Sequence, residues 1–244
     1  MHRMLWALLF ILIAGGAVAG SSSKWSQAIT GEDVTTIGRL LDQVEDVNFP
    51  NHRGKTALMV AARKGHPDVV RLLLEAGAKV NTVNSAGGNA LMYAAVSGDA
   101  ASLRLLLEHD AAVNATGANG WSATMIAAAK GYGSLLDLLI MHGADTNVRD
   151  IYGWTPLMRA THEGRHGIVK SLLSKTSPEI DAQDESGLTA LHRAAAKGYV
   201  DIARLLIEHG ADVSSTDLRG RTPLMVASSA GNKRIADLLS KSVN

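Results

Sequence analysis

Glycine recurs along this chain at a nearly constant interval. The first glycine series consists of Gly54, Gly87, Gly120, Gly153, Gly187 and Gly220, and its interval changes only between Gly153 and Gly187, where it is longer by one. A second glycine, a pair of small residues and a pair of leucines follow in the same register in all six units. A fixed interval of about 33 residues is typical of repeat proteins, in which each unit packs only on its neighbours. The chain is therefore predicted to form a row of similar units.

Each unit has the pattern of two helices joined by a short turn. In the fourth unit, Thr155 can cap the N-terminus of the first helix, and Pro156 is tolerated in its first turn. The second glycine, Gly164 in this unit, favours the left-handed conformation that ends a helix. The second helix carries an apolar stripe, as in residues 69–74. Short polar segments then lead to the next unit.

The motifs within the units resemble the ankyrin repeat. Residues 153–160 (GWTPLMRA), 187–194 (GLTALHRA) and 220–227 (GRTPLMVA) resemble the family's G-x-TPLH-x-A, and residues 143–147 (GADTN) resemble its GADVN repeat end. The resemblance covers residues 51–244 and implies an all-α ankyrin-repeat solenoid of six helix-turn-helix repeats with short hairpin loops. Residues 20–50 are predicted to be a leader followed by a degenerate half-repeat that caps the N-terminal end of the stack.

Residues 1–19 differ from the rest and predict a signal peptide. Arg3 precedes an apolar run over residues 5–14, and Ala17-Val18-Ala19 matches the small-x-small cleavage pattern. The alternative is an uncleaved anchor, because residues 4–23 are uncharged and long enough to cross a bilayer. The chain is exported in either case, and it would contact a membrane only if residues 1–23 are retained. Arg3 also accounts for the net charge of +1, so the remaining chain is neutral.

Composition argues against several classes of function. The near-zero net charge argues against broad electrostatic binding to nucleic acid, which usually needs a basic face. Cysteine is absent, which removes thiol nucleophiles, disulfides and Cys-ligated zinc. No phosphate-binding loop, dinucleotide fingerprint or G-x-S-x-G motif occurs. We therefore predict no catalysis, no cofactor, no metal and no small-molecule substrate.

Residues 162–166 (HEGRH) match the H-E-x-x-H pattern of zinc proteases. That chemistry needs both histidines on one turn of an unbroken helix. Gly164 occupies the helix-ending position of its unit, so His162 should end one helix and His166 should begin the next. We interpret the match as a product of the repeat.

Methionine replaces the histidine of the TPLH motif in most repeats. These residues are predicted to pack between units as flexible apolar filler, rather than to form an exposed row that scavenges oxidants; they are Met59, Met92, Met125, Met158 and Met225. His192 keeps the histidine, for which the resemblance implies a structural hydrogen bond.

The resemblance places partner binding on the hairpin tips and on the exposed face of the first helices. Trp121 and Trp154 follow the first glycine in adjacent units, where other units accept Lys, Gly, Leu or Arg. Trp and Tyr are common interface anchors, and Tyr152 is at the tip beside Trp154. Adding the nearby end of the first helices, we predict a protein-binding patch that contains Trp121, Tyr152, Trp154, Lys130, His162 and Glu163. The alternative is that the tryptophans fold down and pack between hairpins.

The sequence therefore predicts a monomeric, non-catalytic protein-binding scaffold of the bacterial envelope. It would act in the periplasm as an adaptor, an inhibitor or a protective partner of another protein. An inner-membrane-anchored scaffold is the first alternative. An enzyme is the second, and it would require a pocket that the sequence does not reveal.

Overall fold

The computed structural model describes residues 23–242, so the predicted signal peptide over residues 1–19 lies outside them. The chain divides into two compact units with a boundary between Ala112 and Val113. Across residues 23–242 the regular structure is helical, apart from one isolated antiparallel bridge between Thr116 and Ser122. None of the helices within this range is both long and apolar enough to span a membrane.

Every predicted repeat contains a helix pair. The first unit holds a helix over residues 23–30, α2 (Val34–Leu40) with a short 3-10 turn (Leu41–Gln43), α3 (Ala57–Lys64), α4 (Pro67–Glu75), α5 (Ala90–Ser97) and α6 (Ala100–Glu108). The second unit holds α7 (Ala123–Lys130), α8 (Gly133–Met141), α9 (Pro156–His162), α10 (His166–Lys175), α11 (Ala190–Lys197), α12 (Val200–Glu208), α13 (Pro223–Ser229) and α14 (Lys233–Ser242).

Local interactions define where the first helix of each repeat begins and ends. The side chain of Thr155 accepts a hydrogen bond from the Met158 amide at 3.3 Å and caps α9. Gly164 follows α9 in the left-handed region at φ +66°. A Cβ atom there would also lie 3.0 Å from the Tyr199 ring, so a larger residue would strain the backbone and displace that ring. The helix break predicted at Gly164 is confirmed.

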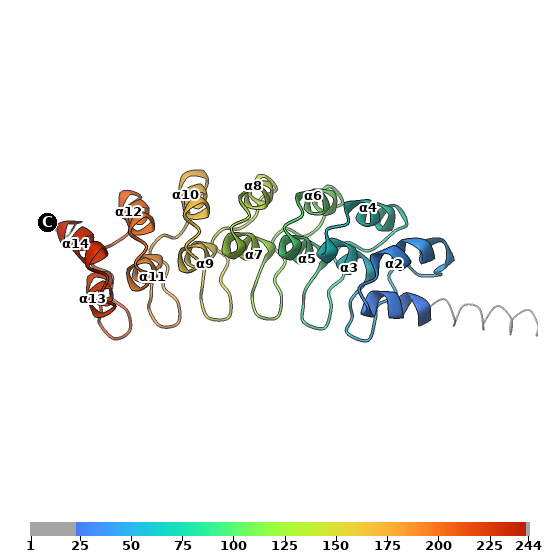
Figure 1. Cartoon of the computed structure of the whole chain (residues 1–244), viewed down its shortest axis with the longest axis horizontal. Helices are drawn as coiled ribbons and strands as arrows, with labels where there is room; N and C mark the ends of the chain where they lie inside the picture. Colours follow the sequence, from blue (N-terminus) through green and yellow to red (C-terminus); the bar gives the residue numbers. More distant parts are fainter. Residues whose placement is uncertain (1–22, 243–244) are drawn as a thin grey trace, which may run out of the picture. The chain divides into compact units, whose positions relative to one another are not determined.

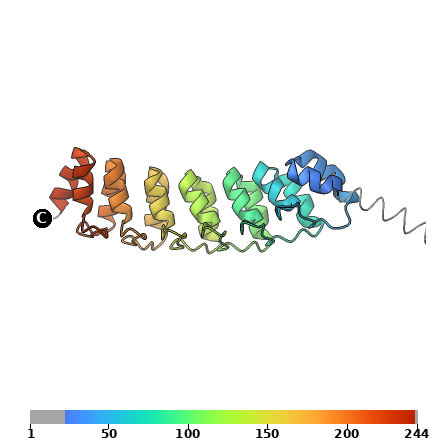
Figure 2. The same ribbon diagram turned by 90° about the horizontal axis from the view of Figure 1, so that it is seen from below.

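The helices of the second unit form two layers. The first helices of its repeats (α7, α9, α11 and α13) lie in one row, and their partners (α8, α10, α12 and α14) lie in the other (Figure 1). Seen at right angles, the connecting loops run along one edge of the helices (Figure 2). The core lies between neighbouring pairs, where Ala127, Ala128, Leu136 and Leu139 are buried. The small alanines allow close helix approach, and the leucines supply the buried apolar area.

The N-terminal segment predicted as a half-repeat contains two helices, residues 23–30 and α2. Glu32 lies between them at φ +54°, one repeat interval before the helix-ending Gly65. Its carboxylate pairs with Lys55 at 3.0 Å, Arg63 at 2.7 Å and Lys64 at 3.1 Å. Burial raises the pKa of Glu32, but the hydrogen bonds and charges of these cations lower it overall. Trp25, Ile29 and Ile37 are buried, so this segment is packed as well as ion-paired.

The methionine prediction is confirmed for four positions and wrong for one. Met59, Met92, Met125 and Met158 are buried. Met225 is 53% exposed, because within the described residues no further helix pair covers α13. An exposed methionine row is therefore absent from the first five repeats.

His192 makes the structural hydrogen bonds that the resemblance implied. Its Nδ1 accepts from the Thr189 amide at 3.2 Å, and its Nε2 lies 2.9 Å from the Arg221 carbonyl of the next repeat. Because Nδ1 acts as an acceptor, Nε2 carries the proton and donates to that carbonyl. Burial lowers the pKa of His192, although the hydrogen bond to the Arg221 carbonyl raises it. The neutral ring therefore joins two repeats.

Candidate functional site

The hairpin tips of repeats 4 and 5 are built around two aspartates. The Oδ1 atom of Asp150 accepts hydrogen bonds from the amides of Tyr152 at 2.9 Å and Trp154 at 3.0 Å. Asp184 accepts in the same way from the amides of Ser186 at 2.8 Å and Leu188 at 2.9 Å. These bonds are the side-chain-to-backbone contacts that make Asp a turn residue. They set the direction in which each tip projects.

The second carboxylate oxygen of each aspartate pairs with an arginine on the following helix. Asp150 pairs with Arg159 on α9, and Asp184 pairs with Arg193 on α11. The side chains of Asp184 and Arg193 are only 5% and 7% exposed, so this ion pair lies inside the protein. Each pair ties a hairpin tip to the first helix of its own repeat.

The two arginines alternate with the two tryptophans that the sequence singled out. The Cζ atom of Arg159 lies 4.6 Å from the centre of the Trp121 ring and 4.1 Å from that of Trp154. Arg193 covers Trp154 from the following repeat, with its Cζ atom 3.2 Å from the ring centre. We call Trp121, Arg159, Trp154 and Arg193 the tryptophan–arginine stack. Cation–π contacts of this kind contribute about 0.5–2 kcal/mol each.

The structure brings several of the predicted site residues together around this stack. His162 meets Trp154 edge-on, with ring centres 5.1 Å apart. Tyr152 is 57% exposed at the tip, whereas Trp121 and Trp154 are half-buried. Lys130 ends α7 and Glu163 follows α9, and within residues 23–242 neither forms a hydrogen bond, salt bridge or cation–π contact with the stack. The tryptophans therefore pack between repeats while Tyr152 faces outward.

The charges that act on His162, beside the stack, are mostly positive. Burial lowers the pKa of His162, and the charges of Lys197, Arg193 and Arg159 lower it further, against the opposite effect of Glu163. Burial also lowers the pKa of Arg193 to about 10, although the negative charge of Asp184 raises it. His162 is thus held in its neutral form near neutral pH.

Comparison with known proteins identifies the repeats. The family model described as "Ankyrin repeats (3 copies)" matches residues 25–117, 111–184 and 177–244, which together cover most of the chain. The chain belongs to the ankyrin repeat family. The ankyrin repeat domain is a protein–protein interaction scaffold, and the fold is generally non-catalytic.

Solved ankyrin repeat structures match most of the chain. The ankyrin repeat domain of Bcl-3, described as a unique member of the IkappaB protein family, is 30% identical with a TM-score of 0.74. The match covers 89% of this chain and 97% of that domain. The human ASB11 ankyrin repeat domain is 26% identical, with a TM-score of 0.75 and coverage of 89% and 96%. The predicted all-α ankyrin-repeat solenoid is confirmed.

Curated relatives match over shorter segments. Potassium channel AKT3 of Oryza sativa subsp. japonica is 54% identical over 19% of this chain and 5% of its own length. The NF-kappa-B inhibitor cactus of Drosophila yakuba is 32% identical over 32% of this chain and 16% of its own length. The chain thus spans a small part of the length of these relatives.

Sequence reasoning missed the arginines and the second role of the aspartates. A signal was present, because Asp150 with Arg159 and Asp184 with Arg193 repeat the same spacing in successive ankyrin repeats. The other repeats do not combine an acid and a base at these two positions, which hold Asn51 and Val60, Asn84 and Tyr93, Gly117 and Ile126, and Asp217 and Val226. The pairs and the tryptophans occur together in repeats 3 to 5.

The H-E-x-x-H match is divided between two helices. Helix α9 ends at His162 and α10 begins at His166, as predicted. The two histidines therefore do not share one helical face. In residues 23–242, no group of three or more His, Asp or Glu side chains is arranged to hold a metal ion.

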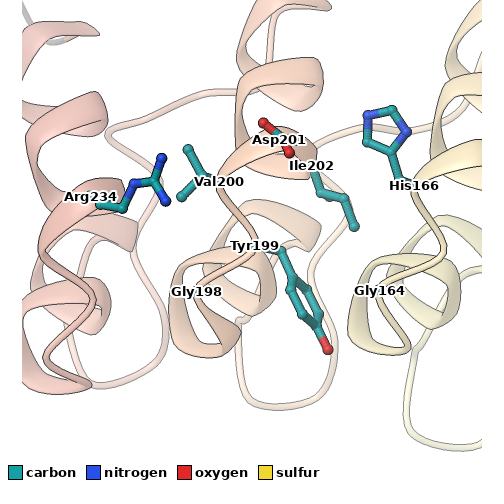
Figure 3. A pocket seen from close by; sticks show the side chains of 8 residues that line it. All are labelled: Gly164, His166, Gly198, Tyr199, Val200, Asp201, Ile202 and Arg234. Carbon is teal, nitrogen blue, oxygen red and sulfur yellow. The ribbon is translucent and has the colours of Figure 1, made fainter.

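A separate hollow lies at the N-terminal ends of the second helices of repeats 4 to 6 (Figure 3). It encloses about 340 Å³ beside His166, Tyr199, Asp201 and Arg234. Figure 3 shows His166, Asp201 and Arg234 on three different helices, with Tyr199, just before α12, pointing away from Asp201. They do not form a nucleophile–base pair or a paired-carboxylate site. The stack and its hairpin tips are therefore the stronger candidate.

Proposed function

We propose that this chain is an exported, non-catalytic ankyrin-repeat scaffold of the bacterial envelope. It binds another protein through the surface formed by Tyr152, the tryptophan–arginine stack, Lys130, His162 and Glu163. In this role it acts as an adaptor, an inhibitor or a protective partner, and it works as a monomer in the periplasm.

The observation that carries the proposal is an exposed tyrosine on a rigidly supported tip. Asp150 holds the amide of Tyr152 at 2.9 Å, and the same carboxylate is anchored to Arg159 within the stack. A tyrosine presented in this way loses little conformational freedom when a partner covers it, which favours binding. Ile151 is also exposed beside it, so the tip offers apolar area where a hairpin would ordinarily be polar.

The envelope location rests on residues 1–19, which have the pattern of a signal peptide. If the segment is retained, the same scaffold is anchored in the inner membrane. N-terminal sequencing of the protein purified from the envelope distinguishes the two. A chain that starts at Gly20 supports the periplasmic form, whereas a chain that starts at Met1 supports the anchored form. Recovery in the cytoplasm with an intact N-terminus would contradict export.

Partner binding is tested by crosslinked capture from envelope extracts. The Tyr152→Ala variant should lose the captured protein, because it removes the exposed ring while leaving the Asp150–Arg159 pair in place. Met141→Ala is the matched control, because Met141 is an exposed apolar residue at the end of α8, outside the proposed surface. Equal capture by both variants would show that the proposed surface does not bind the partner.

A further inference from the structure

The hairpin tips of repeats 4, 5 and 6 are joined by backbone hydrogen bonds into one row. The Glu185 amide donates to the Tyr152 carbonyl at 3.1 Å, and the Leu218 amide donates to the Ser186 carbonyl at 3.1 Å. Figure 1 shows these tips projecting from the row of first helices, as the loops that precede α9, α11 and α13. We call residues 151–152, 185–186 and 218–219 the tip row. Since its backbone is already fixed, the row loses little conformational freedom when a partner covers it.

The tip row presents apolar side chains at both ends. Ile151 is 53% exposed, Tyr152 is 57% exposed and Leu218 is 78% exposed. The tips of the first three repeats hold no large apolar side chain; they are residues 52–53 (HR), 85–86 (SA) and 118–119 (AN). Exposed aromatic and aliphatic side chains that cluster on one surface are typical of binding sites.

Glu185 lies between two hollows of the tip row. The hollow between the tips of repeats 4 and 5 has a volume of about 440 Å³, and it is lined by Tyr152, Leu188 and Glu185 among others. The hollow between the tips of repeats 5 and 6 has a volume of about 330 Å³, and it is lined by Leu188, Glu185 and Leu218 among others. A carboxylate therefore stands in the middle of the row, with apolar side chains in the hollow on each side.

The charge balance of the tip row leaves this carboxylate without a partner. Three of the four arginines that line the two hollows are each paired with an aspartate; the pairs are Arg159–Asp150, Arg193–Asp184 and Arg221–Asp217. Glu185 is exposed and forms no salt bridge within residues 23–242. Arg219 is also exposed and without a salt bridge in that range, but it lines only the hollow on the repeat 6 side. On the repeat 4 side the net charge is therefore negative, which favours a cationic group of a partner.

We propose that the tip row binds a segment of the protein partner in which one basic residue lies between two apolar residues. The basic side chain pairs with Glu185 on its repeat 4 side. One apolar residue packs on Tyr152 and Ile151, and the other packs on Leu218. This inference rests on the proposed function, because it assigns the chemistry of the partner segment that covers Tyr152 and the neighbouring tips.

The spacing of the repeats sets the spacing of the partner residues. Packed neighbouring helices are about 8–10 Å apart, and an extended chain advances about 3.3 Å per residue. An extended partner segment therefore places its apolar, basic and apolar residues about three positions apart.

The test is a titration of the whole protein with two seven-residue peptides, followed by ¹⁵N NMR. The lysine peptide is acetyl-Leu-Gly-Ser-Lys-Ser-Gly-Leu-amide, and the glutamate peptide has Glu in place of the central Lys. The lysine peptide should shift the amide signals of Tyr152, Glu185 and Leu218. It should bind at least about threefold more tightly than the glutamate peptide, because an exposed ion pair gives a modest gain and a like-charge contact gives a loss. Absent shifts at these three residues, or equal affinities for the two peptides, would overturn the proposal.

Reversal of the charge at position 185 provides the second arm. The side chain of Glu185 makes no hydrogen bond within the described residues, so Glu185→Lys should fold normally. This variant should bind the glutamate peptide more tightly than the lysine peptide, because the sign of the exposed charge is inverted. Glu208→Lys is the matched control, because Glu208 is exposed at the end of α12, outside the tip row, and forms no salt bridge within residues 23–242. The control should keep the order of the unchanged protein. The same peptide order in both variants would contradict the assignment.

The two proposals can fail separately. If Tyr152→Ala abolishes capture of the envelope partner while the two peptides bind equally or not at all, the proposed surface is correct and the chemistry assigned to the tip row is wrong. If the lysine peptide binds at the tip row and Glu185→Lys reverses the order, while capture is unaffected by Tyr152→Ala, the assignment of the tip row is upheld and the proposed function is wrong.

Discussion

The ion pair between Asp184 and Arg193 provides the sharpest test of how the stack is held. Asp184→Ala removes the carboxylate from an arginine whose side chain is 7% exposed, and it leaves that charge buried. It also removes the acceptor for the amides of Ser186 and Leu188. Both losses act on the same hairpin tip.

The expected cost is dominated by the unpaired arginine. Removing one partner of a buried pair destabilises a protein by about 3–5 kcal/mol, because the remaining charge is left without compensation. The two lost amide bonds add less: the Ser186 bond is exposed, so water can replace its acceptor, and the Leu188 bond is part-buried. For a protein of this size, such a loss lowers the melting temperature by about 10 °C.

The assay is urea unfolding followed by circular dichroism, with a double-mutant cycle of Asp184→Ala and Arg193→Ala. The coupling energy should be at least about 2 kcal/mol, because the two residues share one buried contact. Asp137→Ala is the matched control. Its pair with Lys175 is 43% and 49% exposed, so it should cost less than about 1 kcal/mol. Equal destabilisation by Asp184→Ala and Asp137→Ala, or a coupling energy near zero, would refute the reasoning.

Three further predictions concern stability. Thr161→Ala should stabilise the protein by about 1 kcal/mol in urea unfolding, because this buried hydroxyl has no partner within the described residues and repeats 1, 2, 3 and 5 hold alanine there. A lower urea midpoint would contradict this. The folded-state pKa of His192 is lowered, so the unfolded chain binds the proton more tightly and stability should fall as the pH drops below about 6.5. In unfolding experiments between pH 7 and pH 5, His192→Met should make the free energy of unfolding depend less on pH. An unchanged pH dependence would exclude His192 as its source. Asn114→Ala should cost about 1–2 kcal/mol, because Asn114 bonds both the Asp145 amide at 2.7 Å and the Gly143 carbonyl at 3.2 Å. An unchanged midpoint would show that water replaces both bonds.

The fold could be predicted in detail because its determinants are local. Thr155 caps α9 through the nearby amide of Met158, and Gly164 ends the following turn in a conformation that glycine adopts easily. Such interactions recur in every repeat, so the constant glycine interval reveals them together. The division of the H-E-x-x-H match between α9 and α10 follows from the same local rule.

The candidate site could be located from the sequence only in part. The aromatic residues of adjacent repeats indicated the region, because tryptophan at that position is not required by the fold. Their surroundings depended on side chains that reach across repeats, as Arg193 does to Trp154. The repeat pattern does not predict which arginine side chain packs on which tryptophan ring.

Sequence alone was sufficient for the repeat register and for the helix break at Gly164, since each depends on close neighbours along the chain. Contacts between repeats were needed to establish that the tryptophans are half-buried between guanidinium groups, that Tyr152 faces outward and that Met225 is uncovered. These properties depend on how one helix pair packs against the next, and packing is decided by shape and charge over distances that a linear pattern does not encode.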